Sequence, residues 1–227
     1  MTVTLITGAN KGIGRETARQ LVALGHDVWI GSRDPARGAV AAAEVGTRSV
    51  QLDVTDDDSV RAALATIAAA GTGLDVVVHN AGILTTDLDG PAALRSFDTN
   101  AVGIVRVTEA ALPLLRASAA PNVVTVSSSA GSFWAVTNPE RAEYGLPLAL
   151  YSASKAAATM LTLQYAKAHP GIRFNAVEPG PKATDMTAAF GIGRSAADSA
   201  RVVVALATTG PAGPTGTFTD EAGTLPW

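Results

Sequence analysis

The chain has 227 residues, of which 47% are hydrophobic, so it is long enough to bury the core of one large domain. It carries 17 basic and 20 acidic residues, and the formal net charge of −3 argues against a general nucleic-acid-binding protein. The lack of cysteine excludes disulfides, thiolate metal sites and cysteine nucleophiles. No basic segment precedes a long apolar run, so we expect a cytoplasmic protein with neither signal peptide nor membrane span.

Short β-branched runs alternate with alanine-rich stretches along the chain. The runs predicted as strands cover residues 3–7, 27–32, 48–52, 74–79, 122–126 and 172–177, with a short one near 216–219. The stretches predicted as helices cover residues 12–24, 35–45, 56–70, 98–116 and 151–169. Thr55 is predicted as the N-cap of the third helix, because three aspartates follow it.

The predicted strands are continuous apolar runs, such as the valines at 76–78 and 123–124. Runs of this kind suit strands that are buried on both faces, as in a parallel sheet. The alternation therefore predicts an α/β fold of the Rossmann type, a doubly wound parallel β-sheet with helices on both faces and right-handed crossovers. No linker or low-complexity tract interrupts the pattern, so residues 1–227 are expected to form a single domain.

Three glycines, Gly8, Gly12 and Gly14, stand between the first predicted strand and the first predicted helix, in the segment T-G-A-N-K-G-I-G. Glycine permits a tight turn and a close approach of the backbone to a pyrophosphate, and a helix N-terminus favours an anion. A glycine-rich loop alone is weak evidence, but in this position it predicts a dinucleotide site. The alternative interpretation is a purely structural turn.

Tyr151 and Lys155 stand four residues apart in a predicted helix, and therefore share one helical face. A phenol has an ordinary pKa near 10, which is too high for proton transfer at neutral pH. A nearby ammonium group stabilises the phenolate, so we expect Lys155 to lower the pKa of Tyr151. The pair predicts a tyrosine that acts as an acid or a base.

The glycine spacing resembles the T-G-x-x-x-G-x-G motif of the short-chain dehydrogenase/reductases. Four later segments resemble motifs of the same family in the same order: H-N-A-G at 79–82, S-S-S-A-G at 127–131, Y-S-A-S-K at 151–155 and P-G-P-K-A-T at 179–184. The resemblance covers nearly the whole chain, from Thr7 to Met186. It implies the Rossmann-type fold of the family and its nicotinamide chemistry.

The end of the second predicted strand bears on the choice of cofactor. Users of NAD usually carry an acid there, but this chain has Ser32 followed by Arg33. The resemblance implies that Arg33 and Lys11 share a 2′-phosphate, which favours NADP(H). The alternative is that both cations are solvated surface charges, with Asp34 partly neutralising Arg33.

The resemblance also implies which residues bind the cofactor. Asp53 is expected to bond the adenine amino group, and Thr184 the nicotinamide carboxamide. His79 replaces the first asparagine of the family motif, and we interpret it as structural rather than as a catalytic base. The expected cofactor-binding residues are Gly8, Asn10, Lys11, Gly12, Ile13, Gly14, Ser32, Arg33, Asp53, Val54, Asn80, Ala81, Gly82, Tyr151, Lys155, Pro179, Gly180 and Thr184.

Ser128 and Asn100 complete the catalytic set that the resemblance implies. The second serine of the family's S-S-x-x-G pattern is catalytic, which selects Ser128 from three consecutive serines, with Ser127 and Ser129 as the alternatives. Asn100 is expected within a helix, where it holds a water against Lys155. The alternative is an asparagine that merely bends a helical turn.

Together these matches predict NADPH-dependent reduction of an aldehyde or ketone to an alcohol. The implied partners are a small carbonyl or alcohol substrate and NADP(H), with no metal, nucleic acid or membrane. Tyr151 donates the proton, and Ser128 polarises the carbonyl oxygen. The alternative is a dinucleotide-binding regulator or sensor that kept the fold without turnover, which the intact catalytic set disfavours.

Two features depart from the family pattern. Tyr151 follows Ser128 by 23 positions, roughly ten more than is usual in the family, and the excess falls in residues 133–150. This insertion is expected to cover the helices used for dimerisation, to wall the substrate pocket with Phe133 and Trp134, or to pack as a surface loop. A homodimer, a homotetramer and a monomer therefore stay open, as does the role of Glu178.

Overall fold

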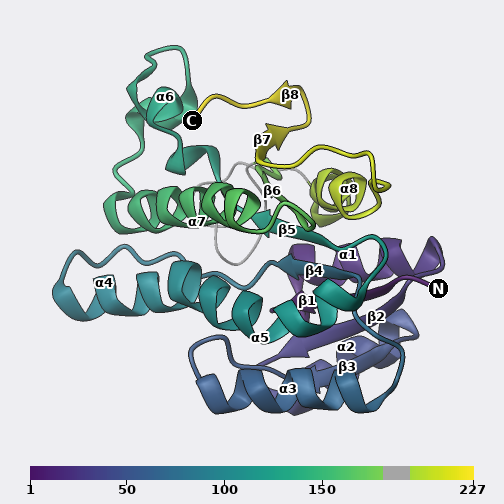
Figure 1. Cartoon of the computed structure of the whole chain (residues 1–227). Helices are drawn as coiled ribbons and strands as arrows, with labels where there is room; N and C mark the ends of the chain where they lie inside the picture. The colour runs from purple at the N-terminus through teal and green to yellow at the C-terminus, as the bar shows by residue number, and fades with distance from the viewer. Residues whose placement is uncertain (181–194) are drawn as a thin grey trace.

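The computed structural model describes residues 1–180 and 195–227, and within them the strands form one sheet (Figure 1). The sheet has the order β3-β2-β1-β4-β5-β6-β7-β8, and every pairing except that of β7 with β8 is parallel. The strands are β1 (Val3–Thr7), β2 (Asp27–Ser32), β3 (Arg48–Gln51), β4 (Val76–His79), β5 (Asn122–Val126), β6 (Arg173–Val177), β7 (Thr217–Asp220) and β8 (Gly223–Thr224). The strand order reverses between β1 and β4, which is where sheets of this type bind ligands.

Helices cover both faces of this sheet (Figure 1). The α-helices are α1 (Gly12–Ala23), α2 (Pro35–Val45), α3 (Asp57–Ala69), α4 (Gly90–Phe97), α5 (Gly103–Ala117), α6 (Phe133–Thr137), α7 (Ala149–Ala168) and α8 (Ala196–Ala207). A π-helix, η1 (Asp98–Val102), joins α4 to α5, and η2 (Ser129–Gly131) and η3 (Ala142–Gly145) are 3-10 turns. The predicted doubly wound α/β fold is therefore confirmed.

Two apolar layers explain why the strands are apolar on both faces. On one face, Leu5 and Val77 pack with the helices α3, α5 and α7. On the other face, Ile6 and Val78 pack with α1, α2 and α8. Because successive side chains of a strand point to opposite faces, each run of β-branched residues serves both layers. This double burial fixes the register of the strands, and with it the positions of the loops at their carboxyl ends.

The start of α3 corrects one prediction. Asp56, and not Thr55, is the N-cap of this helix, since its side chain accepts the amides of Asp58 and Ser59. The backbone amide and hydroxyl of Thr55 instead donate to Asp53 Oδ1, at 3.0 and 2.7 Å. An aspartate that reaches two residues along its own chain competes for the groups that a threonine cap would use.

The predicted helix at 98–116 also needs correction. Residues 98–102 form the π-helix η1, α5 begins only at Gly103, and α4 precedes both. A π-helical turn has i→i+5 hydrogen bonds and cannot be distinguished from an α-helix by its apolar pattern. Helices α4, α6 and α8 were not predicted, although Ser195 caps α8 by accepting the amide of Asp198 and marks its start.

No helix in residues 1–180 or 195–227 is both long and apolar enough to cross a membrane.

Candidate active site

The glycine loop follows β1 and opens α1. Gly8 has a φ of +63°, and a Cβ atom there would lie 2.9 Å from the Cα of Ala81. At Gly14 a Cβ atom would lie 2.4 Å from Asn80 Nδ2. Both positions require glycine, because they hold the loop tightly against the end of β4. The two glycines therefore let the loop pack closely on the end of β4, and the approach of a pyrophosphate to the loop stays a prediction.

Asn80 holds this loop in place from the end of β4. Its Nδ2 donates to the carbonyls of Thr7 and Gly8, at 2.9 and 3.1 Å. The backbone amides of Asn80 and Ala81 both donate to Thr7 Oγ1. The first turn of α1 carries no acidic residue, and its N-cap, Lys11, makes no side-chain cap. The helix N-terminus is therefore suited to an anion such as a pyrophosphate.

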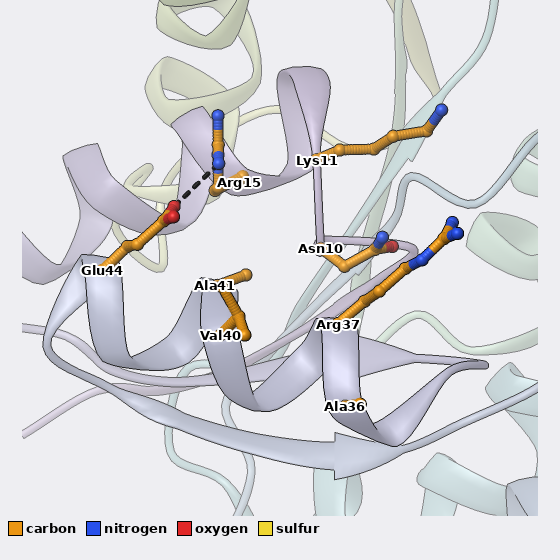
Figure 2. Close-up of a pocket in the computed structure, with 8 residues that line it drawn as sticks. All are labelled: Asn10, Lys11, Arg15, Ala36, Arg37, Val40, Ala41 and Glu44. Carbon is orange, nitrogen blue, oxygen red and sulfur yellow. Dashed lines mark hydrogen bonds and ion pairs between the residues drawn. The ribbon is translucent and has the colours of Figure 1, made fainter.

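A cavity of about 360 Å³ lies beside the loop, between α1 and α2. Figure 2 shows Lys11 and Arg37 reaching in the same direction on either side of Asn10. Arg15 closes the other end of the cavity through an ion pair with Glu44, at 2.7 Å. The cavity thus presents two mobile cationic side chains beside the glycine loop. Arg37 was missed from the sequence, although the segment R-D-P-A-R places two arginines around the start of α2.

Arg33 stands exposed at the end of β2. Asp34, which could have neutralised it, caps α2 by accepting the amides of Ala36 and Arg37, and forms an ion pair with Arg37 at 3.4 Å. No ion pair of Arg33 occurs within the residues that the structure describes. Its guanidinium is therefore available to a ligand.

The remaining residues expected around the adenosine have contacts of their own. Ser32 is buried and its hydroxyl donates to the carbonyl of Asp34, at 2.8 Å. Asp53 uses one carboxylate oxygen for Thr55, and Val54 is buried against Gly103. Ile13 packs partly buried on the α1 side of the sheet. These contacts leave the second oxygen of Asp53 for other partners.

Tyr151 and Ser128 meet at the carboxyl end of β5. Tyr151 lies in the first turn of α7, and its hydroxyl lies close enough to that of Ser128 for Ser128 to lower its pKa. Gly131 allows this approach, because a Cβ atom there would lie 2.6 Å from the backbone nitrogen of Ala156 on α7. Two hydroxyls from separate elements are thus aimed at one point, as a site that activates a carbonyl oxygen requires.

The neighbouring serines are engaged elsewhere. The hydroxyl of Ser127 is 2.6 Å from that of Thr159 and donates to the carbonyl of Lys155. The hydroxyl of Ser129 donates to Glu143, at 2.5 Å. Of the three consecutive serines, only Ser128 is placed beside Tyr151, which supports the choice made from the sequence.

Lys155 is buried beneath this pair. Its Nζ donates to the carbonyl of Val126 at 2.8 Å and lies 5.7 Å from the centroid of the Tyr151 ring. A Cβ atom on Gly82 would lie 3.4 Å from Lys155 Nζ and 3.3 Å from Asn100 Oδ1. The ammonium group, Asn100 and the H-N-A-G segment therefore converge on one small space.

Asn100 is fully buried within η1. Its Oδ1 accepts the amide of Ile83 at 2.8 Å, and its Nδ2 donates to the carbonyl of Ile83 and to Ser154 Oγ, both at 2.9 Å. Its side chain thus clamps the chain after β4 onto α7. A π-helical turn often occurs at functional sites. The expected water is not tested by this geometry.

The expectation of a lowered pKa at Tyr151 is wrong for the chain on its own. Burial raises the pKa of Tyr151 above its ordinary value, and the negative charge of Glu178 raises it further, whereas the Ser128 hydroxyl lowers it. Burial also lowers the pKa of Lys155 to about 8, although Glu178 opposes this. The lysine therefore loses part of its charge near neutral pH, and desolvation outweighs its attraction for the phenolate.

Comparisons with known proteins identify the family. A family model described as short chain dehydrogenase matches residues 2–195. The chain belongs to the short-chain dehydrogenase family. Among curated relatives, (-)-isopiperitenone reductase from Mentha piperita is 30% identical and covers 94% of each chain. A 3-oxoacyl-[acyl-carrier-protein] reductase from Staphylococcus aureus is 34% identical over 82% of this chain and 76% of its own length.

Solved structures of short-chain dehydrogenases have the same architecture. Salutaridine reductase from Papaver somniferum superposes with a TM-score of 0.84 at 27% identity, covering 96% of this chain and 99% of its own. A variant of actinorhodin polyketide ketoreductase with NADPH superposes with a TM-score of 0.82 at 25% identity, covering 98% and 96%. The family thus supports an oxidoreductase that binds a nicotinamide dinucleotide.

The insertion of this short-chain dehydrogenase forms α6 and η3. It packs on η2 and on the end of the chain, where the amide of Trp134 donates to the carbonyl of Trp227 at 3.1 Å (Figure 1). Phe133 is 74% exposed, so it does not form an apolar wall within the described residues. Instead, Arg141 and Glu143 line a second cavity of about 240 Å³, together with Glu178.

The segment after β6 carries the last residues of the expected site. Pro179 is buried, and Gly180 has a φ of +83° and donates its amide to Glu178 Oε1 at 2.6 Å. Thr184 lies outside the described residues. His79 is buried on β4 and its Nε2 is 2.9 Å from Thr108 Oγ1 on α5, which supports a structural role. Burial lowers its pKa to about 3, so it is neutral.

Proposed function

We propose that this short-chain dehydrogenase reduces an aldehyde or ketone to an alcohol with NADPH. The observation that carries the proposal is that Ser128 and Tyr151 neighbour each other at the carboxyl end of β5, with the buried Nζ of Lys155 5.7 Å from the centroid of the Tyr151 ring. The glycine loop and the cationic cavity lie across the strand-order reversal from this pair. Such an arrangement suits a dinucleotide with its reactive end at the two hydroxyls.

Each catalytic residue has a task in this proposal. Tyr151 is the general acid, and its phenol is protonated at neutral pH. Ser128 donates to the carbonyl oxygen and holds it within reach of the phenol. The bound cofactor supplies the hydride that the carbonyl carbon accepts. Lys155 and Asn100 lie beneath the phenol and return the proton from solvent.

The residues around the loop fit a cofactor with a 2′-phosphate. Gly8 and Gly14 leave no room for a side chain, so the backbone can approach a pyrophosphate. Arg33 is exposed, and Lys11 and Arg37 face the cavity between α1 and α2. Guanidinium groups bind phosphate through two parallel hydrogen bonds. Users of NAD usually carry an acid at the end of the second strand, which accepts a hydrogen bond from the ribose 2′-hydroxyl. This chain has Arg33 there, which favours NADP(H) over NAD(H).

The proposal also covers the substrate class, the cellular compartment and the domain organisation. The substrate is a small molecule with a carbonyl group, and the protein acts in the cytoplasm on a reduced cofactor pool. No cluster of His, Cys, Asp and Glu that could hold a metal occurs in the described residues. The reaction as proposed is carried by the hydroxyls and the ammonium group. Residues 1–227 act as one domain.

The first test measures consumption of NADPH and of NADH by the purified protein with a broad panel of aldehydes, ketones and diketones. We expect turnover, and we expect it to be faster with NADPH. Calorimetric titration of each cofactor without substrate gives binding independently of turnover. Binding of NADPH with no consumption across the whole panel would contradict the reductase and favour a dinucleotide sensor on the same fold.

A further inference from the structure

Glu178, directly after β6, is a buried carboxylate that the proposed mechanism does not use. The residue is only 8% exposed, and charged residues are seldom buried to this extent without partners. Within the part of the chain that the structure describes, it makes no ion pair. Within residues 1–180 and 195–227 its partners are two backbone amides, whose dipoles stabilise the desolvated charge.

The two amides belong to the two loops that frame the reaction site. Oε2 accepts the amide of Ser129, the residue after Ser128, and Oε1 accepts the amide of Gly180 at 2.6 Å. The strands β5 and β6 pair up to Val126 and Val177, and the amide of Ser127 donates to the carbonyl of Val177 at 2.8 Å. The carboxylate therefore continues the link between the two strands beyond the end of their ladder.

The bond to the amide of Ser129 also brings the carboxylate near the acid–base pair, because Ser128 directly precedes Ser129. Its negative charge raises the pKa of Tyr151 and opposes the lowering of the pKa of Lys155. A negative charge near a phenol disfavours the phenolate, so the charge of Glu178 opposes ionisation of Tyr151.

Other charged groups on the elements packed against α7 have partners of their own or lie in the last turns of helices. They are Arg95 with Asp87, Asp98 with Arg106, Glu109 with Tyr165, Arg173 with the carbonyls of Ala120 and Thr209, Glu143 with Arg141, and Arg116 and Lys167 in the last turns of α5 and α7. Strand β5 and η2 carry no charged residue. Glu178 is therefore the charge that acts on Tyr151 from the described surroundings of the site.

We infer that Glu178 is a positioning residue of this site: it ties the Ser128 loop to the Pro179–Gly180 turn, and it places a negative charge near Tyr151. Carbonyl reduction needs a protonated phenol, whereas alcohol oxidation needs a phenolate. Glu178 therefore extends reduction to higher pH and confines oxidation to alkaline pH. The inference rests on the proposed function, and it assigns a direction to that function.

Two substitutions distinguish the charge from the tie, because both weaken the tie and only one removes the charge. Glu178→Gln removes the charge and also one of the two loop bonds, since its amide nitrogen cannot accept from a backbone amide, and the phenol should ionise at a lower pH. Glu178→Asp keeps the charge on a shorter side chain that does not reach both amides, so the pH dependence should stay while kcat falls. Glu143→Gln is the matched control, because Glu143 bonds the side chain of Ser129 and lines the same cavity without contacting either loop amide.

The first measurement is the titration of the Tyr151 phenol by its ultraviolet absorbance in the protein without cofactor. Tyr151→Phe identifies the signal, since the chain has two other tyrosines. We expect Glu178→Gln to lower the onset of ionisation by about one pH unit, a tenfold change in the phenolate fraction, and Glu143→Gln to leave it in place. An onset in Glu178→Gln equal to that of the unmodified protein would overturn the assigned charge effect.

The second measurement is the pH profile of kcat and of KM for alcohol oxidation. The alkaline rise should move by about one unit to lower pH in Glu178→Gln and should keep its place in Glu178→Asp, with KM for the alcohol little changed. A profile that moves equally in both variants would overturn the separation of tie and charge. If the unmodified protein turns over no substrate, the proposed function fails, and the absorbance titration still decides the role of Glu178.

Discussion

The glycine loop after β1 shapes its part of the site with backbone, whereas the region around β5 and β6 uses buried side chains. Gly8 and Gly14 shape the first region because a side chain there would strike Ala81 or Asn80. In the second region, Tyr151 and Lys155 lie on α7, Ser128 lies at the start of η2, and Glu178 adds a charge after β6. Local spacing therefore specifies the first region, and tertiary packing sets the chemistry of the second.

The difference affects what each region tolerates. The glycine loop is disrupted when a side chain is added at Gly8 or Gly14, but the backbone there has no group that ionises. A cluster of buried polar side chains keeps its shape when one hydroxyl is removed, yet its proton affinities depend on every neighbouring charge. Substitutions in the first region should therefore lower binding and stability together, and those in the second should lower turnover alone.

The largest effect is expected from removing the general acid. Tyr151→Phe deletes the hydroxyl beside Ser128 and leaves the ring in place, so turnover should fall by roughly 10²- to 10⁴-fold. Affinity for NADPH should change little, which calorimetric titration checks beside single-turnover rates. Tyr165→Phe is the control, because Tyr165 lies near the carboxyl end of α7, where its hydroxyl donates to Glu109 of α5. Retained turnover in Tyr151→Phe would refute the assigned acid.

The next largest effect is expected in the glycine loop. In Gly14→Ala the new methyl group would lie 2.4 Å from Asn80 Nδ2 and 2.8 Å from the Cα of Ala9. Asn80 would have to give up its bonds to the loop, which should lower the free energy of unfolding by about 1–3 kcal/mol and weaken cofactor binding. Gly90→Ala is the control, since nothing lies within 4 Å of the added atom. Denaturant unfolding and NADPH titration of both variants test whether binding and stability fall together.

The two regions also differ in how much of them the sequence predicts. Spacing alone predicts the glycine loop, the alternation of strands and helices, and the shared face of Tyr151 and Lys155, because each depends on local geometry. The pKa of Tyr151 was predicted with the wrong sign, since burial and the charge of Glu178 come from elements that meet only in the folded chain. Arg37 was missed for a similar reason, because the cavity between α1 and α2 is a tertiary feature.

A smaller effect is expected at the phosphate-binding cations. Arg33→Ala should raise KM for NADPH by tenfold or more, about 1.4 kcal/mol or above, and leave KM for NADH nearly unchanged. Arg37→Ala should act in the same direction but less strongly, because Arg37 shares its charge with Asp34. Arg61→Ala on α3, whose partner is Asp58, is the control. Equal changes with both cofactors would remove the argument for a 2′-phosphate.

The smallest effect tests whether β4, which joins the two regions, is sensitive to pH. His79 is neutral in the folded chain because burial lowers its pKa to about 3, whereas an unfolded histidine has a pKa near 6.5. Between these values the unfolded state binds the extra proton, so stability is complete above pH 6.5 and falls by about 1.4 kcal/mol per unit of acidification below it. His79→Asn should remove this slope even if losing the bond to Thr108 lowers stability at neutral pH.

Urea unfolding at several pH values between 5 and 7 measures how the free energy of unfolding of both proteins depends on pH. His26, whose pKa burial also lowers, is present in both proteins, so the difference between their slopes isolates His79. Identical slopes would mean that His79 is already protonated in the fold, and β4 would then carry a buried charge into the centre of the sheet.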